Sequence, residues 1–223
     1  MGPVKKTKSD KTKDKILIAA RAVFARHPYH AASMRMIGKE GDFDHPIIRY
    51  HFPSKARLFE TVISDICDEF YTANLQCYKG LEGIPPEQGF SQYIDRLIKY
   101  SNKNSESLSI LMLNIAQSDT GDEEEKVPGY SKIPEFFART RATFNEKVPV
   151  KASDEEVERY LDSFNTLLVS YLGASSCHAS ILGIKPNSTK YRSWVKKTLT
   201  FLFLSKLKRL IYGDDYRHPQ TQS

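Results

Sequence analysis

Apolar residues recur at intervals of three and four positions along most of this chain, and no stretch alternates apolar and polar residues as a half-buried strand would. Glycine, proline and capping residues divide the pattern into segments. The pattern predicts an all-α protein of about nine helices. They are expected at residues 12–27, 33–40, 45–51, 55–78, 87–100, 107–117, 133–148, 153–182 and 188–212.

Two short helices near the start are predicted to be joined by a tight turn. Ser33 is placed to cap the first, and Gly41-Asp42 supplies the two residue types that best tolerate a left-handed backbone. Asp44 suits the cap of the second, with Pro46 in its first turn, where no helical N–H is needed. This arrangement is typical of the helix-turn-helix unit, whose second helix enters the DNA major groove. A plain corner between two helices of a soluble bundle is the alternative.

The second short helix is predicted to have two different faces. Ile48 and Phe52 fall on the buried side. The exposed side holds hydrogen-bond donors, rings and one arginine: His45, Ile47, Arg49, Tyr50 and His51. Such a surface suits contact with nucleic acid, whereas packing against the first helix is the structural alternative for Tyr50 and His51.

The formal charge of +6 is unevenly distributed. Residues 1–57 hold 13 Lys and Arg against 5 Asp and Glu, and the remainder holds 20 against 22. A positive excess confined to the segment with the predicted helix-turn-helix favours binding to phosphates, because neutralising them releases counterions. A basic tail that serves only solubility is the alternative, and residues 1–11 are expected to form a disordered basic arm.

Residues 32–57 resemble the DNA-binding domain of the TetR (tetracycline repressor) family of bacterial transcriptional regulators. The resemblance lies in Ser33-Met34-Arg35, Ile37, Pro46, Ile48-Arg49-Tyr50-His51-Phe52 and Ser54-Lys55. It implies a helix-turn-helix DNA-binding domain at residues 12–57 and a helical domain for effector binding and dimerisation at residues 58–223.

The resemblance also implies which residues contact DNA. They are Ser33, Arg35, His45, Pro46, Ile47, Arg49, Tyr50, His51 and Lys55. His45, Pro46 and Ile47 occupy positions that look like readers of base edges and thymine methyl groups, and Tyr50, His51 and Lys55 match positions that hold phosphates. Arg49 stands where the family usually has tyrosine, so a phosphate and the O6/N7 edge of guanine are both open to it.

The last two predicted helices favour self-association. The final one is apolar all round at residues 201–204, so it needs cover on two sides, and the one before it carries small residues that permit close approach. We expect these helices to form a two-fold dimer interface, as the resemblance also implies. The residues expected there are Leu172, Ser175, Ser176, Ala179, Trp194, Leu199, Leu202 and Phe203.

The middle of the chain is rich in aromatic residues, which suits an apolar ligand pocket with a few polar anchors. The residues expected to line it are Phe70, Asn74, Tyr93, Tyr100, Met112, Phe137, Phe144 and His178, with Asn114 as a further anchor. Ordinary core packing is the alternative for each ring. The resemblance implies that a ligand bound there lowers the affinity for DNA.

Enzyme signatures are missing, including the phosphate-binding, dinucleotide-binding, zinc-protease and serine-hydrolase motifs. No cofactor or metal site is predicted. The three cysteines form no C-x-x-C pair and are expected to be reduced. Because the chain opens with no signal-peptide pattern and has no apolar run of bilayer length, we expect a cytoplasmic protein that does not contact a membrane.

These patterns together predict a dimeric DNA-binding transcriptional regulator. Its partners would be a palindromic operator in double-stranded DNA, a second copy of itself, and a small apolar or amphipathic effector that relieves repression. Two other classes remain open. One is a helical enzyme or carrier whose basic end is incidental, and the other is a sequence-neutral nucleoid protein.

Overall fold

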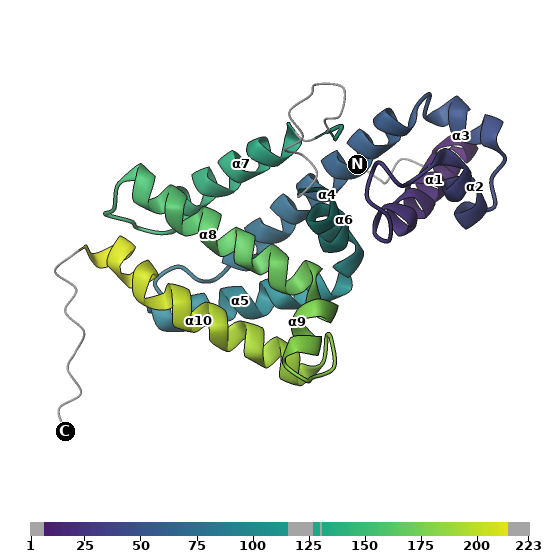
Figure 1. The fold of residues 1–223 in the computed structure, drawn as a ribbon. Helices are drawn as coiled ribbons and strands as arrows, with labels where there is room; N and C mark the ends of the chain where they lie inside the picture. Colours follow the sequence, from purple (N-terminus) through teal and green to yellow (C-terminus); the bar gives the residue numbers. More distant parts are fainter. Residues whose placement is uncertain (1–6, 116–126, 130, 214–223) are drawn as a thin grey trace. The chain divides into compact units, whose positions relative to one another are not determined.

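The computed structural model describes residues 7–115, 127–129 and 131–213, and every regular element within them is a helix (Figure 1). These residues form ten helices, one more than the pattern predicts, and the all-α class is confirmed. The chain forms two compact units: unit 1 comprises residues 1–68 and 106–134, and unit 2 comprises residues 69–105 and 135–223. Within the described residues, no helix is both long and apolar enough to cross a bilayer.

Unit 1 is organised around one small core. It contains α1 (Lys8–Phe24), α2 (Met34–Gly41), α3 (His45–His51), the first part of α4 (Lys55–Tyr78) and nearly all of α6 (Ser105–Ile115). Its core comprises buried residues at helical spacing on the first four of these helices: Ile16, Ala20, Phe24, Ile37, Ile48, Leu58 and Phe59. The rings of Phe24 and Phe59 meet edge to face, with 4.7 Å between their centroids.

Helix α1 begins earlier than the sequence pattern indicated. Thr7 is its cap: the Thr7 hydroxyl accepts from the Asp10 N–H at 3.1 Å, and the Asp10 carboxylate accepts from the Thr7 N–H at 3.0 Å. This reciprocal pair satisfies two N–H groups of the first turn. The prediction that this helix begins at residue 12 was therefore wrong, and residues 8–11 are helical rather than part of an arm. Residues 1–6 lie outside the described part.

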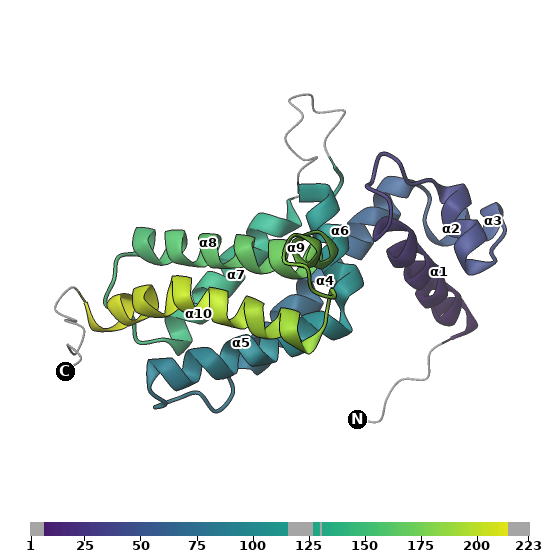
Figure 2. The same ribbon diagram turned by 60° about the horizontal axis from the view of Figure 1, so that its bottom comes forward.

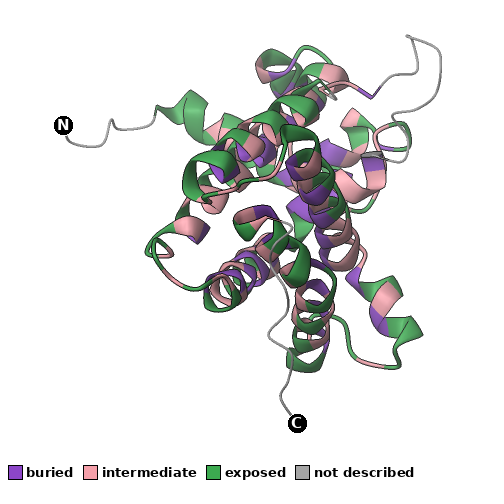
Figure 3. Cartoon of the chain, turned by 90° about the vertical axis from the view of Figure 1, so that its left-hand side faces the viewer, coloured by how far each residue is buried: buried purple, intermediate pink, exposed green. Residues whose placement is uncertain are grey.

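Unit 2 contains the rest of α4, α5 (Pro86–Lys103), most of α7 (Lys132–Lys147), α8 (Asp154–Gly173), α9 (Ser175–Ile181) and α10 (Thr189–Tyr212). Helices α5, α8 and α10 lie side by side, as Figures 1 and 2 show. Buried residues gather on the sides of the helices that face one another (Figure 3). Aromatic rings from α5, α7, α8 and α10 pack there: Phe90, Phe144, Tyr160, Phe164 and Phe203.

The single helix predicted at residues 153–182 is divided in two. Its start is as expected, because Ser153 and Glu156 form a capping box. At Ala174 the backbone leaves the helical region (φ −108°, ψ 33°). The fully buried Tyr191 of α10 donates its hydroxyl to the Tyr171 carbonyl at 2.6 Å, an acceptor that a continuous helix would offer to the N–H of Ser175. A tertiary hydrogen bond therefore accompanies the break, and the local sequence does not reveal it.

Candidate nucleic-acid interface

The turn between α2 and α3 depends on two adjacent residues with different roles. Asp42 holds the left-handed conformation (φ 55°, ψ 51°), and the next N–H, of Phe43, donates to the Gly38 carbonyl at 2.9 Å. Gly41 is helical, but a Cβ there would overlap the Phe43 ring and lie 2.9 Å from the Ala19 Cβ. The tight turn predicted from the sequence is present. Its left-handed residue is the aspartate, and the glycine provides space for the ring.

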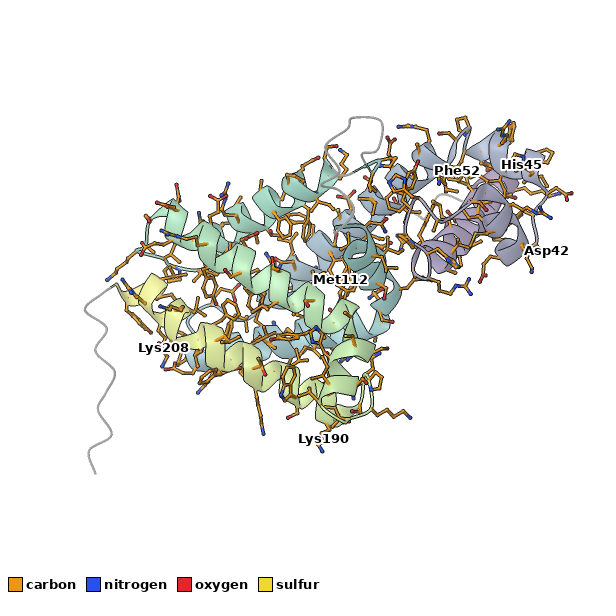
Figure 4. All side chains as sticks on the ribbon, in the orientation of Figure 1. Asp42, His45, Phe52, Met112, Lys190 and Lys208 are labelled. Atoms are coloured by element: carbon orange, nitrogen blue, oxygen red, sulfur yellow. The ribbon has the colours of Figure 1, made fainter. Side chains whose placement is uncertain are left out.

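Helix α3 has the two faces expected of it. Ile48 is fully buried, and Phe52, which follows the helix, is also buried. Its neighbours Tyr50 and Ile47 are 82 % and 42 % exposed. In Figure 4 the labels Asp42, His45 and Phe52 mark the turn and the two ends of this helix. One side therefore anchors α3 in unit 1, and the other presents side chains to solvent.

The remaining residues of α3 that were predicted to contact DNA lie on its solvent side. His45, Pro46 and Arg49 are exposed, and His51 is half-buried. The rings of Tyr50 and His51 meet edge to face with centroids 5.1 Å apart. Packing of Tyr50 into the body of unit 1, the alternative considered for it, is not observed.

The predicted residues outside α3 are divided between exposed and internal positions. Ser33 caps α2 by accepting from the Met36 N–H at 3.3 Å, and Arg35 in the first turn of α2 is exposed. Lys55 opens α4 but is engaged internally: its ammonium donates to the carbonyls of Tyr29 and Ala32, both at 2.9 Å. Two of its three N–H donors are therefore used inside the protein.

Burial around Lys55 changes its acid–base behaviour. The ammonium lies 4.3 Å from the centroid of the Tyr29 ring, and burial lowers the pKa of Lys55 from its ordinary value. Burial and the nearby carboxylate of Glu60 raise the pKa of Tyr29. The lysine thus fixes the loop between α1 and α2 onto the start of α4, and a phosphate contact by its third donor remains a prediction.

Tyr29 is a junction that the sequence pattern did not identify. Its N–H donates to the Asn114 Oδ1 at 2.9 Å, and the buried Asn114 donates its Nδ2 to the Ile110 carbonyl at 2.8 Å. Helix α6 is thereby connected to the loop before α2 within unit 1. One lone pair and one N–H of the Asn114 amide are used within unit 1, and its suggested role as a ligand anchor stays a prediction.

Unit 2 holds an apolar cavity of about 140 Å³ bordered by α4, α5, α7, α8 and α10. Of the residues predicted to line a ligand pocket, Tyr93 and Phe144 line this cavity. Asn74 does not, but its Nδ2 donates to the Tyr93 hydroxyl at 2.8 Å. The cavity residues that the sequence did not indicate include Tyr160 and Phe164, which gave no signal beyond a general richness in aromatic side chains.

The other predicted pocket residues lie elsewhere. Phe70 and Tyr100 pack against each other with ring centroids 5.1 Å apart, and Phe137 packs against Phe136. The distance from the His178 Nε2 to the Ser170 hydroxyl oxygen is 3.2 Å. Met112 belongs to α6 in unit 1. None of these five predicted residues borders the cavity.

The residues predicted for the dimer interface separate by burial. Five of them are covered by their own unit and offer no surface to a second copy: Leu172, Ser175, Ala179, Leu199 and Phe203. Trp194 is half-buried, while Ser176 and Leu202 are exposed. Near them the structure exposes large apolar side chains that were not selected, above all Phe201 at 85 % and Ile181 at 77 %. One side of α10 packs into its own unit and holds Leu199 and Phe203, whereas Phe201 lies on the side that faces solvent.

Unit 1 has the architecture of a helix-turn-helix DNA-binding domain, with its second short helix exposed, and unit 2 is a separate helical body. Residues 16–62 match the model of a family described as bacterial regulatory proteins, tetR family. The resemblance to the TetR family that the sequence shows is thereby confirmed over these residues, which hold the helix-turn-helix.

Solved structures of regulators share the fold. GusR from Salmonella enterica superposes with a TM-score of 0.59 at 19 % identity, covering 90 % of this chain and 99 % of that one. A tetR-family transcriptional regulator from Streptomyces coelicolor gives 0.62 at 11 % identity, covering 95 % and 90 %. A TetR-like transcriptional regulator from Rhodococcus sp. RHA1 gives 0.58 at 15 % identity, covering 94 % and 100 %. A search of curated proteins found no match.

Proposed function

We propose that this regulator is a repressor that binds an inverted-repeat operator as a homodimer and releases it when a small apolar or amphipathic effector binds unit 2. The observation that carries the proposal is the exposed side of α3. This side contains the 82 % exposed ring of Tyr50 and the neighbouring Arg49, and the helix has a proline in its first turn. Such exposed side chains contribute little to the stability of unit 1. The surface suits a helix that lies in a major groove.

The charge of the N-terminal segment supports DNA as the partner. The excess of basic over acidic residues in residues 1–57 provides the sequence-independent part of the affinity, through contacts to phosphates. His45, Ile47 and Arg49 on the exposed side of α3 would then provide the sequence-dependent part. A nucleoid protein needs only the first of these contributions.

Dimerisation is supported by the exposed apolar side chains of α9 and α10. Ile181, Leu182, Phe201 and Leu202 are large and exposed in one subunit, and such side chains cost free energy when grouped in water. A two-fold contact lets the same surface cover itself. Two recognition helices related by that axis would read two half-sites of an inverted repeat.

In this proposal the effector releases the operator by shifting the equilibrium between a DNA-bound and a released conformation of the protein. A ligand lowers the affinity for the operator only if it binds the released conformation more tightly than the DNA-bound one. Moving the population from 1:99 to 99:1 requires a difference of about 5.5 kcal/mol. The cavity in unit 2 offers buried apolar surface from which such a difference can arise.

A gel-shift titration with the promoter region of the protein's own gene tests the proposal against its alternatives. We expect binding that survives an excess of unrelated DNA and that Arg49→Ala and Tyr50→Ala each weaken at least tenfold. Arg159→Ala, an exposed arginine of unit 2, is the control and should bind as the wild type does. Binding that ignores sequence and both α3 substitutions would favour the nucleoid protein, and no binding would favour the enzyme or carrier.

A further inference from the structure

The cavity in unit 2 is almost entirely uncharged. Its borders carry two charged groups of opposite sign, Glu82 and Lys147, and both are exposed. The other bordering residues are aliphatic, aromatic, glycine or proline. Its volume of about 140 Å³ is close to the roughly 150 Å³ at which an apolar cavity accommodates one benzene ring. Size and lining therefore favour a ligand built on a single ring.

One polar group beside this cavity has no partner. Tyr160 borders the cavity, its hydroxyl is buried, and within the described residues it makes no hydrogen bond. Buried hydroxyls are nearly always paired, since an unpaired one forfeits the hydrogen bonds it makes with water. The ring of Tyr160 is held in place by Phe144 and Phe203, with centroids 6.0 and 5.6 Å away, so the hydroxyl has little freedom to find a partner in the protein.

A second phenol of the cavity, Tyr93, is already paired: its hydroxyl accepts from the Asn74 Nδ2 at 2.8 Å. The third, Tyr78, packs against it with 4.9 Å between the ring centroids. Burial raises the pKa of Tyr78, Tyr93 and Tyr160 well above neutrality, so all three hydroxyls are uncharged. Nothing in the buried part of the cavity would balance a charge on a ligand, and a charged end would lose its hydration without compensation.

We propose that this cavity is the effector site and that its ligand is an uncharged, single-ring compound whose one hydroxyl or carbonyl group pairs with the Tyr160 hydroxyl. The inference rests on the proposed function, because it names the chemical class of the effector which that function requires. A phenol with a small apolar substituent is the simplest member of the class. Carboxylates and amines of the same size are disfavoured, because the charged border groups Glu82 and Lys147 are exposed and the rest of the lining is neutral.

Calorimetric titration of the full-length protein with three matched probes tests the ligand class. The probes are 4-methylphenol, p-xylene, in which a methyl group replaces the hydroxyl, and 4-methylbenzoate, which adds a charge. We expect 4-methylphenol to bind about tenfold more tightly than either of the others, which is the effect of one buried hydrogen bond. Failure of 4-methylphenol to bind, or tighter binding of p-xylene or 4-methylbenzoate, would overturn the inference.

Two substitutions locate the site. Tyr160→Phe keeps the ring and removes the hydroxyl, so 4-methylphenol should lose about tenfold in affinity while p-xylene loses none. Gly89→Leu should abolish binding of both probes, because Gly89 borders the cavity and a Cβ there meets nothing closer than the Ile84 carbonyl at 4.0 Å. Equal affinity of the wild type and Tyr160→Phe for 4-methylphenol would remove the role of the hydroxyl.

The same probes in the gel shift separate this inference from the proposed function. Release of the promoter fragment by 4-methylphenol, lost in Gly89→Leu, is the result expected if both hold. If the calorimetry is as expected but the DNA complex persists, the ligand class of the cavity stands and its assignment as the effector site is overturned. Specific DNA binding with no calorimetric signal leaves the DNA-binding proposal intact and overturns the inference.

Discussion

At the scale of single residues, the turn before α3 requires one residue with a left-handed backbone and one residue without a side chain. Asp42 is the first and Gly41 is the second. The position that needs a left-handed backbone holds an aspartate, a residue type that tolerates it better than most. The position that needs an absent side chain holds the glycine, because the Phe43 ring packs where a Cβ would be. The direction in which α3 leaves the turn therefore depends on a steric fit of one ring to one glycine.

Gly41→Ala is expected to destabilise unit 1 by about 1–3 kcal/mol, the usual cost of overpacking, despite the better helix propensity of alanine. Thermal unfolding followed by circular dichroism measures it. Gly89→Ala is the matched control, since its Cβ has room, and it should be neutral or stabilising by up to about 1 kcal/mol. Similar unfolding temperatures for the two variants would contradict the steric argument.

A second prediction at this scale concerns the Tyr191 hydroxyl. Burial raises the pKa of Tyr191 to about 12, so the folded protein keeps this proton at a pH where the unfolded chain has lost it. The raised pKa of Tyr191 adds to the free energy of unfolding. This contribution is fully present below about pH 10, the ordinary pKa of tyrosine, and is lost as the pH rises toward 12. Tyr191→Phe should therefore flatten the fall of unfolding free energy between pH 10 and 12. It should also cost about 1 kcal/mol at pH 7 by removing the bond to Tyr171. An unchanged alkaline slope would contradict this assignment.

At the scale of elements, α3 is held by one row of side chains and presents another. A helix of seven residues has little stability of its own, so its position depends on Ile48 and Phe52 in the core of unit 1. The exposed residues between them are free to be selected for contact with DNA. Stability and recognition are thus assigned to adjacent residues of one short helix.

The adjacent isoleucines Ile47 and Ile48 test this separation. Ile48→Ala should destabilise unit 1 by about 2–5 kcal/mol, because Ile48 is fully buried. Ile47→Ala, which starts 42 % exposed, should cost less than about 1 kcal/mol and instead weaken binding to the promoter fragment. Chemical denaturation and gel shift on the same preparations measure both effects. Equal destabilisation by the two substitutions would show that α3 does not have separate faces.

At the scale of the whole molecule, the surface of unit 2 bears large apolar side chains that the unit does not use. Phe201 is 85 % exposed on α10, although the neighbouring Phe203 is buried in the same unit. Isolated exposed apolar residues are ordinary, but several on the neighbouring helices α9 and α10 favour an association surface. A second copy of the chain is the partner that we propose for it.

Phe201→Glu should convert the protein to a monomer, because a two-fold contact places the two new carboxylates close together without water. Sedimentation at micromolar concentration measures the change. Ile18→Glu is the control, since Ile18 on α1 of unit 1 is 67 % exposed and is not part of the proposed surface. A dimer that persists in Phe201→Glu, or a wild-type monomer, would require a different association surface.

The hydrophobic pattern predicted the helical class, the paired short helices and the buried side of α3, because these follow from local periodicity. The same pattern selected Leu199 and Phe203 for an interface, but both are buried in their own unit. Periodicity identifies apolar residues without telling which neighbour covers them. It also had no means to select Tyr160 over other rings as a cavity residue.

The sequence by itself thus determined most of the helical segments, the caps at Ser33 and Ser153, and which family the DNA-binding segment resembles. These features depend on residues within a few positions of one another, as in the Ser153 and Glu156 capping box. Only the tertiary structure decided that Tyr191 reaches Tyr171 where α8 ends, that Asn114 ties α6 to the loop before α2, and that a neutral cavity borders Tyr160. Each of these features joins residues far apart in the chain, and their contact is set by packing, which local spacing does not encode.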